Sequence, residues 1–202
     1  MFTKDDLDKI GINSITKNID KNKGIVLDCR LFYALVSPNV NTKIKDYNYD
    51  FDVYLKKYGI NLQRPYVWKR YQQQEFIMSI LLEKPIDPII VVQYVHDTNR
   101  ENCTNFIIDG KQRLMTIQKF GRNKFPITVD GNEVYYKDFD EKMKLYFQSR
   151  VNFLSANVYY SYYYDPITDD EMIALFNYYN FTGTPQAKKH KDMLESLVKN
   201  IT

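Results

Sequence analysis

Cysteine and histidine are scarce in this chain of 202 residues, which contains two of each. Cys29 and Cys103 cannot build a disulfide framework, and such low usage is typical of a reducing compartment. His96 and His190 lie far apart in the sequence. No Cys/His cluster has zinc spacing, and no histidine-based nuclease motif can be assembled from them.

Long hydrophobic runs are missing as well. The longest, "PIIVVQYV" at 88–95, is far too short to span a bilayer. The opening residues, "MFTKDDLDKIG", are acidic and polar, which excludes a secretory signal. We therefore expect a cytoplasmic protein with no membrane partner.

Glycine is rare, with only 7 residues, so each one is expected where the backbone geometry demands it. The net charge of +3 is compatible with a polyanionic partner but too weak to argue for one. Hydrophobic residues make up 44% of the chain and charged residues 26%, which is typical of a folded domain with its own core.

The hydrophobic pattern divides the chain near residue 50. Residues 1–50 have no clear period, and we interpret them as an N-terminal extension packed on the main domain. Residues 51–202 mix expected strands and helices without a regular βαβ repeat, which indicates the α+β class. The expected strands are 89–95 and 103–108, paired as a hairpin, a hairpin around Asp130-Gly131, and 157–164; extended chain is expected over 51–68.

Helices are expected where apolar residues recur every three or four positions. One such segment begins near residue 71 and places Phe76, Ile77 and Ile80 on one face. A second covers 111–120, with Gly121 as its expected stop. A third is expected to be capped by Asp138, and a fourth opens with the capping-box pair Thr168 and Glu171.

The stretch "NFIIDGKQRLMTIQKF" at 105–120 turns from a strand into a helix at Asp109 and Gly110. In the simplest interpretation, Asp109 caps the helix, Gln112 is its capping-box partner and Gly110 allows the sharp turn. Lys111 and Arg113 would then be solvated side chains.

The same corner also predicts a phosphate site. A helix that starts directly after a strand exposes its first backbone N–H groups, which attract anions. Gly110 removes a Cβ that would keep a phosphate away, while Lys111 and Arg113 add positive charge. Asp109 could hold Mg²⁺ or orient a water, and Gln112 could position a water or a nucleotide hydroxyl. The pattern is not a Walker loop.

Several segments resemble the N-terminal domain of GmrSD-type restriction systems, a member of the ParB/sulfiredoxin-like superfamily. They are "QRPYVW" at 63–68, "SILLEKPID" at 79–87, "IIDGKQRLMTI" at 107–117 and the loop "NYYNFTGTPQ" at 177–186. The family motif is Asp-Gly-Gln-Gln-Arg, and Lys111 replaces its first glutamine here. The resemblance implies a ParB/sulfiredoxin-like domain, a small mixed sheet flanked by helices.

The resemblance also implies a Mg²⁺-dependent nucleoside triphosphatase that acts on or with DNA. Asp109, Gln112 and Arg113 would be catalytic, and Asp109 would bind the Mg²⁺ ion that arrives with the nucleotide. The expected nucleotide-binding residues are Gln63, Arg64, Gly110, Lys111, Arg113, Asn180 and Thr184. A separate His-Asn-His nuclease subunit is the expected partner. Sulfiredoxin chemistry itself needs a cysteine inside the phosphate corner. It is excluded here, because Cys103 lies six residues before the corner.

Two other functions stay open at this point. The domain could be a non-catalytic, nucleotide-gated module that binds DNA or protein, such as a virus or mobile element encodes. It could also be a structural subunit that kept the fold. The tyrosines at 159–164 could stack bases or be half-buried strand residues, and the basic cluster at 188–191 could contact phosphates or be solvated.

Overall fold

A five-stranded mixed sheet forms the centre of the molecule. The structure is a computed structural model that describes residues 21–26, 31–36, 48–98, 102–180 and 196. The strands lie in the order β1-β9-β5-β6-β2, in which β9 is antiparallel to β1 and parallel to β5, and β6 is antiparallel to β5 and parallel to β2. Their bounds are Lys21–Val26 (β1), Asn48–Asp50 (β2), Ile89–Val95 (β5), Cys103–Asp109 (β6) and Ser155–Tyr162 (β9).

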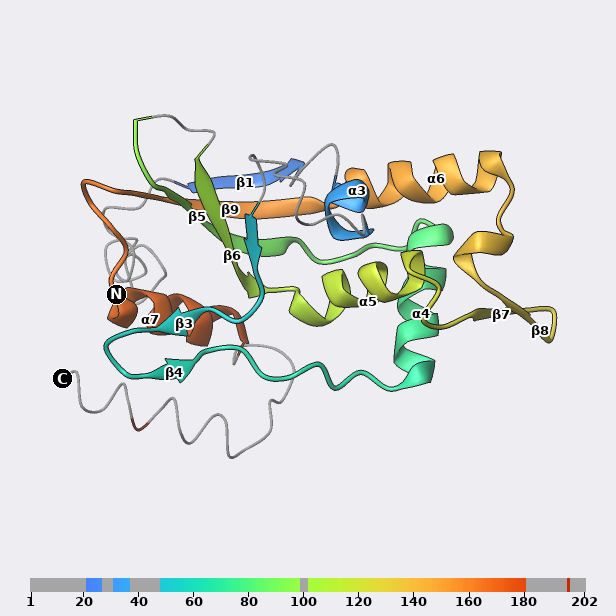
Figure 1. Cartoon of the computed structure of the whole chain (residues 1–202), viewed down its shortest axis with the longest axis horizontal. Helices are drawn as coiled ribbons and strands as arrows, with labels where there is room; N and C mark the ends of the chain where they lie inside the picture. Colours follow the sequence, from blue (N-terminus) through green and yellow to red (C-terminus); the bar gives the residue numbers. More distant parts are fainter. Residues whose placement is uncertain (1–20, 27–30, 37–47, 99–101, 181–195, 197–202) are drawn as a thin grey trace, which may run out of the picture.

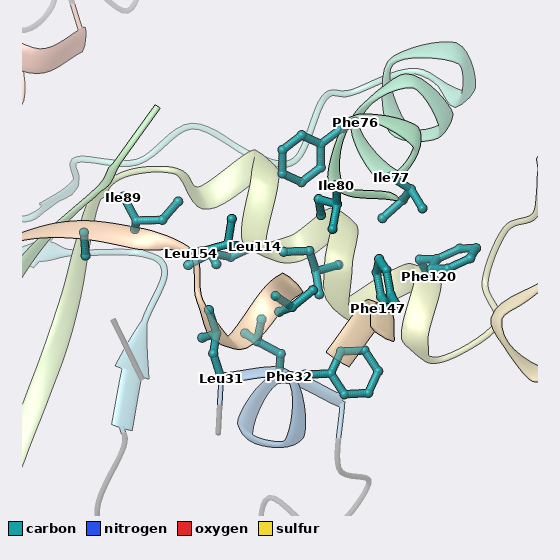
Figure 2. Packing of buried hydrophobic residues seen from close by; sticks show 14 of the residues in the cluster. Leu31, Phe32, Phe76, Ile77, Ile80, Ile89, Leu114, Phe120, Phe147 and Leu154 are labelled. Carbon is teal, nitrogen blue, oxygen red and sulfur yellow. The ribbon is translucent and has the colours of Figure 1, made fainter. Parts of the chain in front are cut away.

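Four helices cover one face of this sheet and enclose the larger hydrophobic core. They are α3 (Leu31–Val36), α4 (Arg70–Leu81), α5 (Lys111–Gly121) and α6 (Glu141–Asn152). Figure 2 shows side chains from all four helices pointing toward one another beside Ile89 and Leu154. Phe120 is fully buried and meets the ring of Phe147 edge-on at 5.4 Å, so aromatic packing joins α5 to α6.

The opposite face is covered by α7 (Asp169–Asn180) and a small hairpin of β3 (Tyr54–Leu55) and β4 (Ile60–Asn61), which lie together in Figure 1. Successive residues of β5 alternate between the two cores, because neighbouring side chains of a strand point to opposite faces. Lys57 ties the hairpin to α7: its N–H donates to Asp169 at 2.7 Å, and its ammonium pairs with Asp170 at 2.7 Å.

Most elements expected from the sequence are confirmed. The structure has the α+β class with a small sheet flanked by helices, whereas the ParB/sulfiredoxin-like assignment stays a prediction. Helix α4 buries Phe76, Ile77 and Ile80, as their spacing indicated. The Asp130-Gly131 turn joins β7 (Ile127–Val129) to β8 (Asn132–Val134) with both turn residues at positive φ. Thr168 and Glu171 exchange both bonds of a capping box.

One of the expected helix ends is wrong. Helix α5 does end at Gly121, as the sequence indicated, but this glycine also has a packing role, because a Cβ there would come within 2.5 Å of Val36 Cγ2. The glycine therefore lets α3 approach α5. Asp138 belongs to a short 3₁₀ helix (Tyr136–Asp138), and α6 is capped by Asp140, whose carboxylate accepts the Met143 N–H at 2.7 Å.

The described parts of residues 1–50 belong to the same body as the rest. β1 and β2 are the two edge strands of the sheet, and α3 buries Leu31, Phe32 and Leu35 against the helices of the larger core. The division of the chain into an N-terminal extension and a main domain at residue 50 stays a prediction.

The tyrosine-rich segment forms the end of β9 and the turn after it. Tyr159 is fully buried, whereas Tyr164 is 69% exposed, and the rings of Tyr160, Tyr162 and Tyr164 stack on one another. The half-buried strand interpretation is the one the burial supports. The basic cluster at 188–191 lies outside the described residues. Within the described part of the chain, no helix has the length and apolarity needed to cross a bilayer.

Candidate functional site

The strand-to-helix corner expected at Asp109 and Gly110 is present, and a β-bulge precedes it. Ile90 pairs with Asp109 but Val91 pairs with Ile107, so Ile108 is an extra residue in β6. Bulges turn a strand and redirect its side chains. Here the bulge directs the end of β6 into α5, which begins at Lys111.

Gly110 is required by the backbone of the corner. Its φ of +110° is one that residues with a Cβ rarely adopt. A Cβ would lie 2.6 Å from Ile89 Cδ1, so it would point at the sheet. The expectation that the missing Cβ makes room for a phosphate is therefore corrected: the glycine is needed for the turn and for close packing on Ile89.

Asp109 and Arg113 bind each other across the first turn of α5. Arg113 Nη2 donates to Asp109 Oδ2 at 2.7 Å, and the same guanidinium donates to the carbonyls of Asp87 and Pro88. The side chain of Arg113 is only 13% exposed. The simpler interpretation, in which Asp109 caps the helix, is wrong, because the N-cap residue is Gly110 and no side chain caps the helix there.

Lys111 is a buried cation with an exposed partner. Its side chain is 8% exposed, and Nζ lies 2.9 Å from Oδ1 of Asp52, whose side chain is 70% exposed. The bond from this ammonium holds the pKa of the Asp52 carboxyl below its usual range. Lys111 was expected to be either a solvated residue or a phosphate ligand. The structure excludes the solvated alternative.

Gln112 holds the segment 65–67 against the start of α5. Its Oε1 accepts the Val67 N–H at 2.9 Å, and its Nε2 donates to the Pro65 carbonyl at 3.1 Å. The residue is 8% exposed. A role in positioning water or a nucleotide hydroxyl stays a prediction, but the described contacts of this amide are structural.

Gln63 and Asn180 both bind the bulged end of β6. Gln63 Nε2 donates to the carbonyls of Ile107 at 2.6 Å and Ile108 at 2.8 Å, and Asn180 Nδ2 donates to the Ile108 carbonyl at 3.2 Å. Strand β2 ends opposite Phe106, so it provides no partner for these carbonyls. The two amides replace the missing strand and fix the corner in place.

Arg64 differs from the other two cations of the site. It is partly buried, and among the described residues no hydrogen bond or ion pair is recorded for its side chain. Its guanidinium is therefore the cation that an incoming anion meets without first displacing a described partner.

The side chains at the corner and their neighbours line one cavity of about 620 Å³. The predicted site residues that the structure describes come from three separate segments and converge there: Gln63, Arg64, Asp109, Gly110, Lys111, Gln112, Arg113 and Asn180. Thr184 lies outside the described residues. The backbone N–H groups of Lys111, Gln112 and Arg113 have no recorded acceptor among the described residues, as expected for the first turn of a helix.

The other lining residues were not expected from the sequence. The apolar ones are Trp68, Phe76, Pro85 and Ile86, and the polar ones are Gln72, Glu75, Ser79, Asp87 and Tyr179. Trp68 packs edge-on against Phe76 at 5.4 Å and also lines the cavity. Positions 72, 75, 76 and 79 follow helical spacing, and this signal could have identified the face of α4 that meets the cavity.

A magnesium site at the cavity would need carboxylate ligands. The described residues contain no group of three or more Asp, Glu, His or Cys side chains that could hold a metal. Asp109, Glu75 and Asp87 each bring a carboxylate to the lining. Mg²⁺ commonly uses one or two carboxylates together with phosphate oxygens and water, so this donor set suits it.

Comparison with known proteins identifies the family. The model of the GmrSD restriction endonuclease N-terminal domain matches residues 51–200. No curated protein matches the chain. No solved structure matches it either. Because the family model covers most of the chain, the chain belongs to the GmrSD restriction endonuclease N-terminal domain family.

Proposed function

We propose that this protein binds a nucleoside triphosphate with Mg²⁺ in the cavity at the Asp109–Arg113 corner and hydrolyses it, in connection with DNA. Membership of the GmrSD family suggests a role in a restriction system. The observation that carries the proposal is the convergence of residues 63–64, 109–113 and 180 on one cavity of about 620 Å³. That volume lies within the range of small-molecule sites.

The corner supplies the groups that a polyphosphate needs. The first N–H groups of α5 and the guanidinium of Arg64 bind phosphate oxygens, and Lys111 adds a third source of positive charge. The apolar side chains of Trp68 and Phe76 in the lining accommodate the less polar part of the nucleotide. A lining that contains both charged and apolar residues therefore suits a nucleotide.

Hydrolysis requires that negative charge be stabilised as the phosphoryl group transfers. When bound, Mg²⁺ neutralises part of that charge. Asp109 would hold the metal or orient the attacking water. Its Oδ2 is bound to Arg113, which fixes the carboxylate, and its side chain is 39% exposed. Arg113 keeps Asp109 and the loop at Asp87 in position through its bonds to both.

Phosphate release from each of the four ribonucleoside triphosphates, with Mg²⁺ and with or without DNA, tests this function. We expect release by the wild type and its loss in Asp109→Ala. Arg64→Ala should weaken nucleotide binding by roughly tenfold without lowering the melting temperature, because no described contact depends on it. Lys142→Ala on the exposed surface of α6 is the charge-matched control.

The other outcomes separate the alternative functions. Tight nucleotide binding without release would support a nucleotide-gated module that binds DNA or a nuclease subunit. If the protein neither binds nor hydrolyses a nucleotide, the proposal is contradicted and a structural role for the fold remains. A plasmid-cleavage assay with the same samples tests separately whether DNA is cut.

A further inference from the structure

The position of Asp52 follows from the topology of the sheet. β2 and β6 are parallel neighbours, so both run toward the same edge of the sheet. Asp52 lies two residues beyond the end of β2, and Lys111 lies two residues beyond the end of β6. Their side chains meet at this edge, with Nζ and Oδ1 2.9 Å apart.

The two partners are in different surroundings. Lys111 is nearly buried and lines the cavity, whereas Asp52 is largely exposed and does not line it. Among the described residues, Asp52 is the only acceptor recorded for the Lys111 ammonium, which has three N–H donors. This cation can therefore bind a ligand in the cavity, but its charge is compensated by a carboxylate outside it.

The turn that carries Asp52 is built to hold this carboxylate. Asp50 Oδ1 accepts the N–H groups of Asp52 at 2.8 Å and Val53 at 3.2 Å. Val53 has a φ of +50°, which is rare for a β-branched residue, and its carbonyl accepts the Leu62 N–H at 3.1 Å. A strained residue persists only where its surroundings fix it, so the position of Asp52 is specified rather than incidental.

The carboxylate of Asp52 affects how much positive charge the site offers to an anion. The cavity lining contains three cations, Arg64, Lys111 and Arg113, and three carboxylates, Glu75, Asp87 and Asp109. Arg113 is already paired with Asp109. With Asp52 paired to Lys111, the corner offers an incoming polyphosphate little uncompensated positive charge except at Arg64.

We propose that Asp52 is a built-in competitor of the phosphate ligand: it occupies Lys111 in the empty site and is displaced from the ammonium when a polyphosphate binds. The proposal rests on the function proposed above. Asp52 sets the affinity of the site for the polyphosphate, and its ion pair with Lys111 forms again when the product leaves. Because the charge of Asp52 repels a polyphosphate bound at Lys111, its removal tightens binding of the anion.

The test uses inorganic tripolyphosphate without Mg²⁺, titrated calorimetrically into the full chain. Asp52→Asn keeps the shape and an acceptor oxygen but removes the charge, and we expect roughly five- to tenfold tighter binding than in the wild type. Glu141→Gln removes the same charge from an exposed ion pair with Lys144 on α6 and should leave the affinity unchanged. Circular dichroism melting checks that each variant is folded, and Asp52→Ser replaces Asp52→Asn if that variant fails to fold.

Affinity equal to or weaker than that of the wild type in the Asp52 variants would overturn the proposal. Weaker binding together with a lower melting temperature would show that Asp52 only holds Lys111 in place. If the wild type binds neither tripolyphosphate nor any Mg²⁺–nucleotide, the proposed function fails as well. If the wild type binds tripolyphosphate and Asp52→Asn binds it with the same affinity, only the role of Asp52 is overturned.

Discussion

Gln112 on α5 accepts the backbone N–H of Val67 at 2.9 Å, across a separation of 45 residues in the sequence. The same amide donates to the carbonyl of Pro65. These bonds hold the segment after Arg64 against the corner that carries Asp109. The buried side chain of Gln112 thus joins the two family segments, residues 63–68 and 109–113, into one site.

Replacing Gln112 by alanine tests this connection. The variant leaves the Val67 N–H and the Pro65 carbonyl without their partner, so we expect unfolding free energy to fall by about 1–3 kcal/mol. Binding of Mg²⁺–nucleotide should weaken as well, because Arg64 is no longer held in place. Denaturant unfolding and calorimetric titration measure the two effects.

Gln72→Ala is the matched control for Gln112. Gln72 also lines the cavity, but its Oε1 accepts only the exposed Lys69 N–H at 2.9 Å, so we expect a loss of about 1 kcal/mol or less. If Gln112→Ala loses turnover while its stability and affinity stay at the wild-type level, the amide acts on water or nucleotide and not on the segment 65–67.

Gly110→Ala tests the backbone of the corner. The new Cβ would have to share space with Ile89 Cδ1 at 2.6 Å, in a residue whose φ is +110°. We expect a loss of about 2–4 kcal/mol, from overpacking and left-handed strain together. Chemical denaturation of the purified variant measures it.

Gly131→Ala separates the two causes. Gly131 also has positive φ, +78°, but a Cβ there would meet no atom within 4 Å. It should lose only the conformational part, about 1–2 kcal/mol. Equal losses at both glycines would mean that the packing of Gly110 on Ile89 contributes nothing.

Gly121→Ala tests the docking of α3 on α5. Alanine in a helix interior is ordinarily favoured over glycine by about 1 kcal/mol. Here its Cβ would lie 2.5 Å from Val36 Cγ2, so we expect destabilisation by about 1–3 kcal/mol. Combining it with Val36→Ala should recover part of this loss, because the smaller side chain makes room.

A double-mutant cycle in denaturant gives the coupling between these two positions. Strictly additive losses would show that α3 does not contact α5 at Gly121. Glycine at this position would then need another explanation, such as the helix stop that the sequence suggested.

The elements with strong local signals were predictable. Helix α4 was recognised from the spacing of Phe76, Ile77 and Ile80, and the hairpin from Asp130-Gly131. Asp138 has a Glu three residues later and so fits the capping-box spacing, but the residue that caps α6 is Asp140, whose carboxylate accepts the Met143 N–H. Local patterns specify that a helix starts in a region better than they specify the residue at which it starts.

Most residues that were predicted for the site do line the cavity, but their contacts could not be predicted. The motif placed Asp109, Gly110, Lys111, Gln112 and Arg113 at one corner, and resemblance added Gln63, Arg64 and Asn180. It did not reveal that Gln63, Gln112 and Asn180 brace the backbone, or that Lys111 and Arg113 are paired with carboxylates. Those pairings depend on residues far away in the sequence.

The sequence by itself determined the strand, the turn and the helix of the phosphate corner, because these follow from side-chain periodicity and from a glycine that tolerates positive φ. Only the tertiary structure decided which charges face the cavity. The parallel pairing of β2 with β6 brings Asp52 to Lys111, and the bulge at Ile108 sets the direction of α5. Charge compensation is a property of distances between chain segments, and no local pattern encodes those distances.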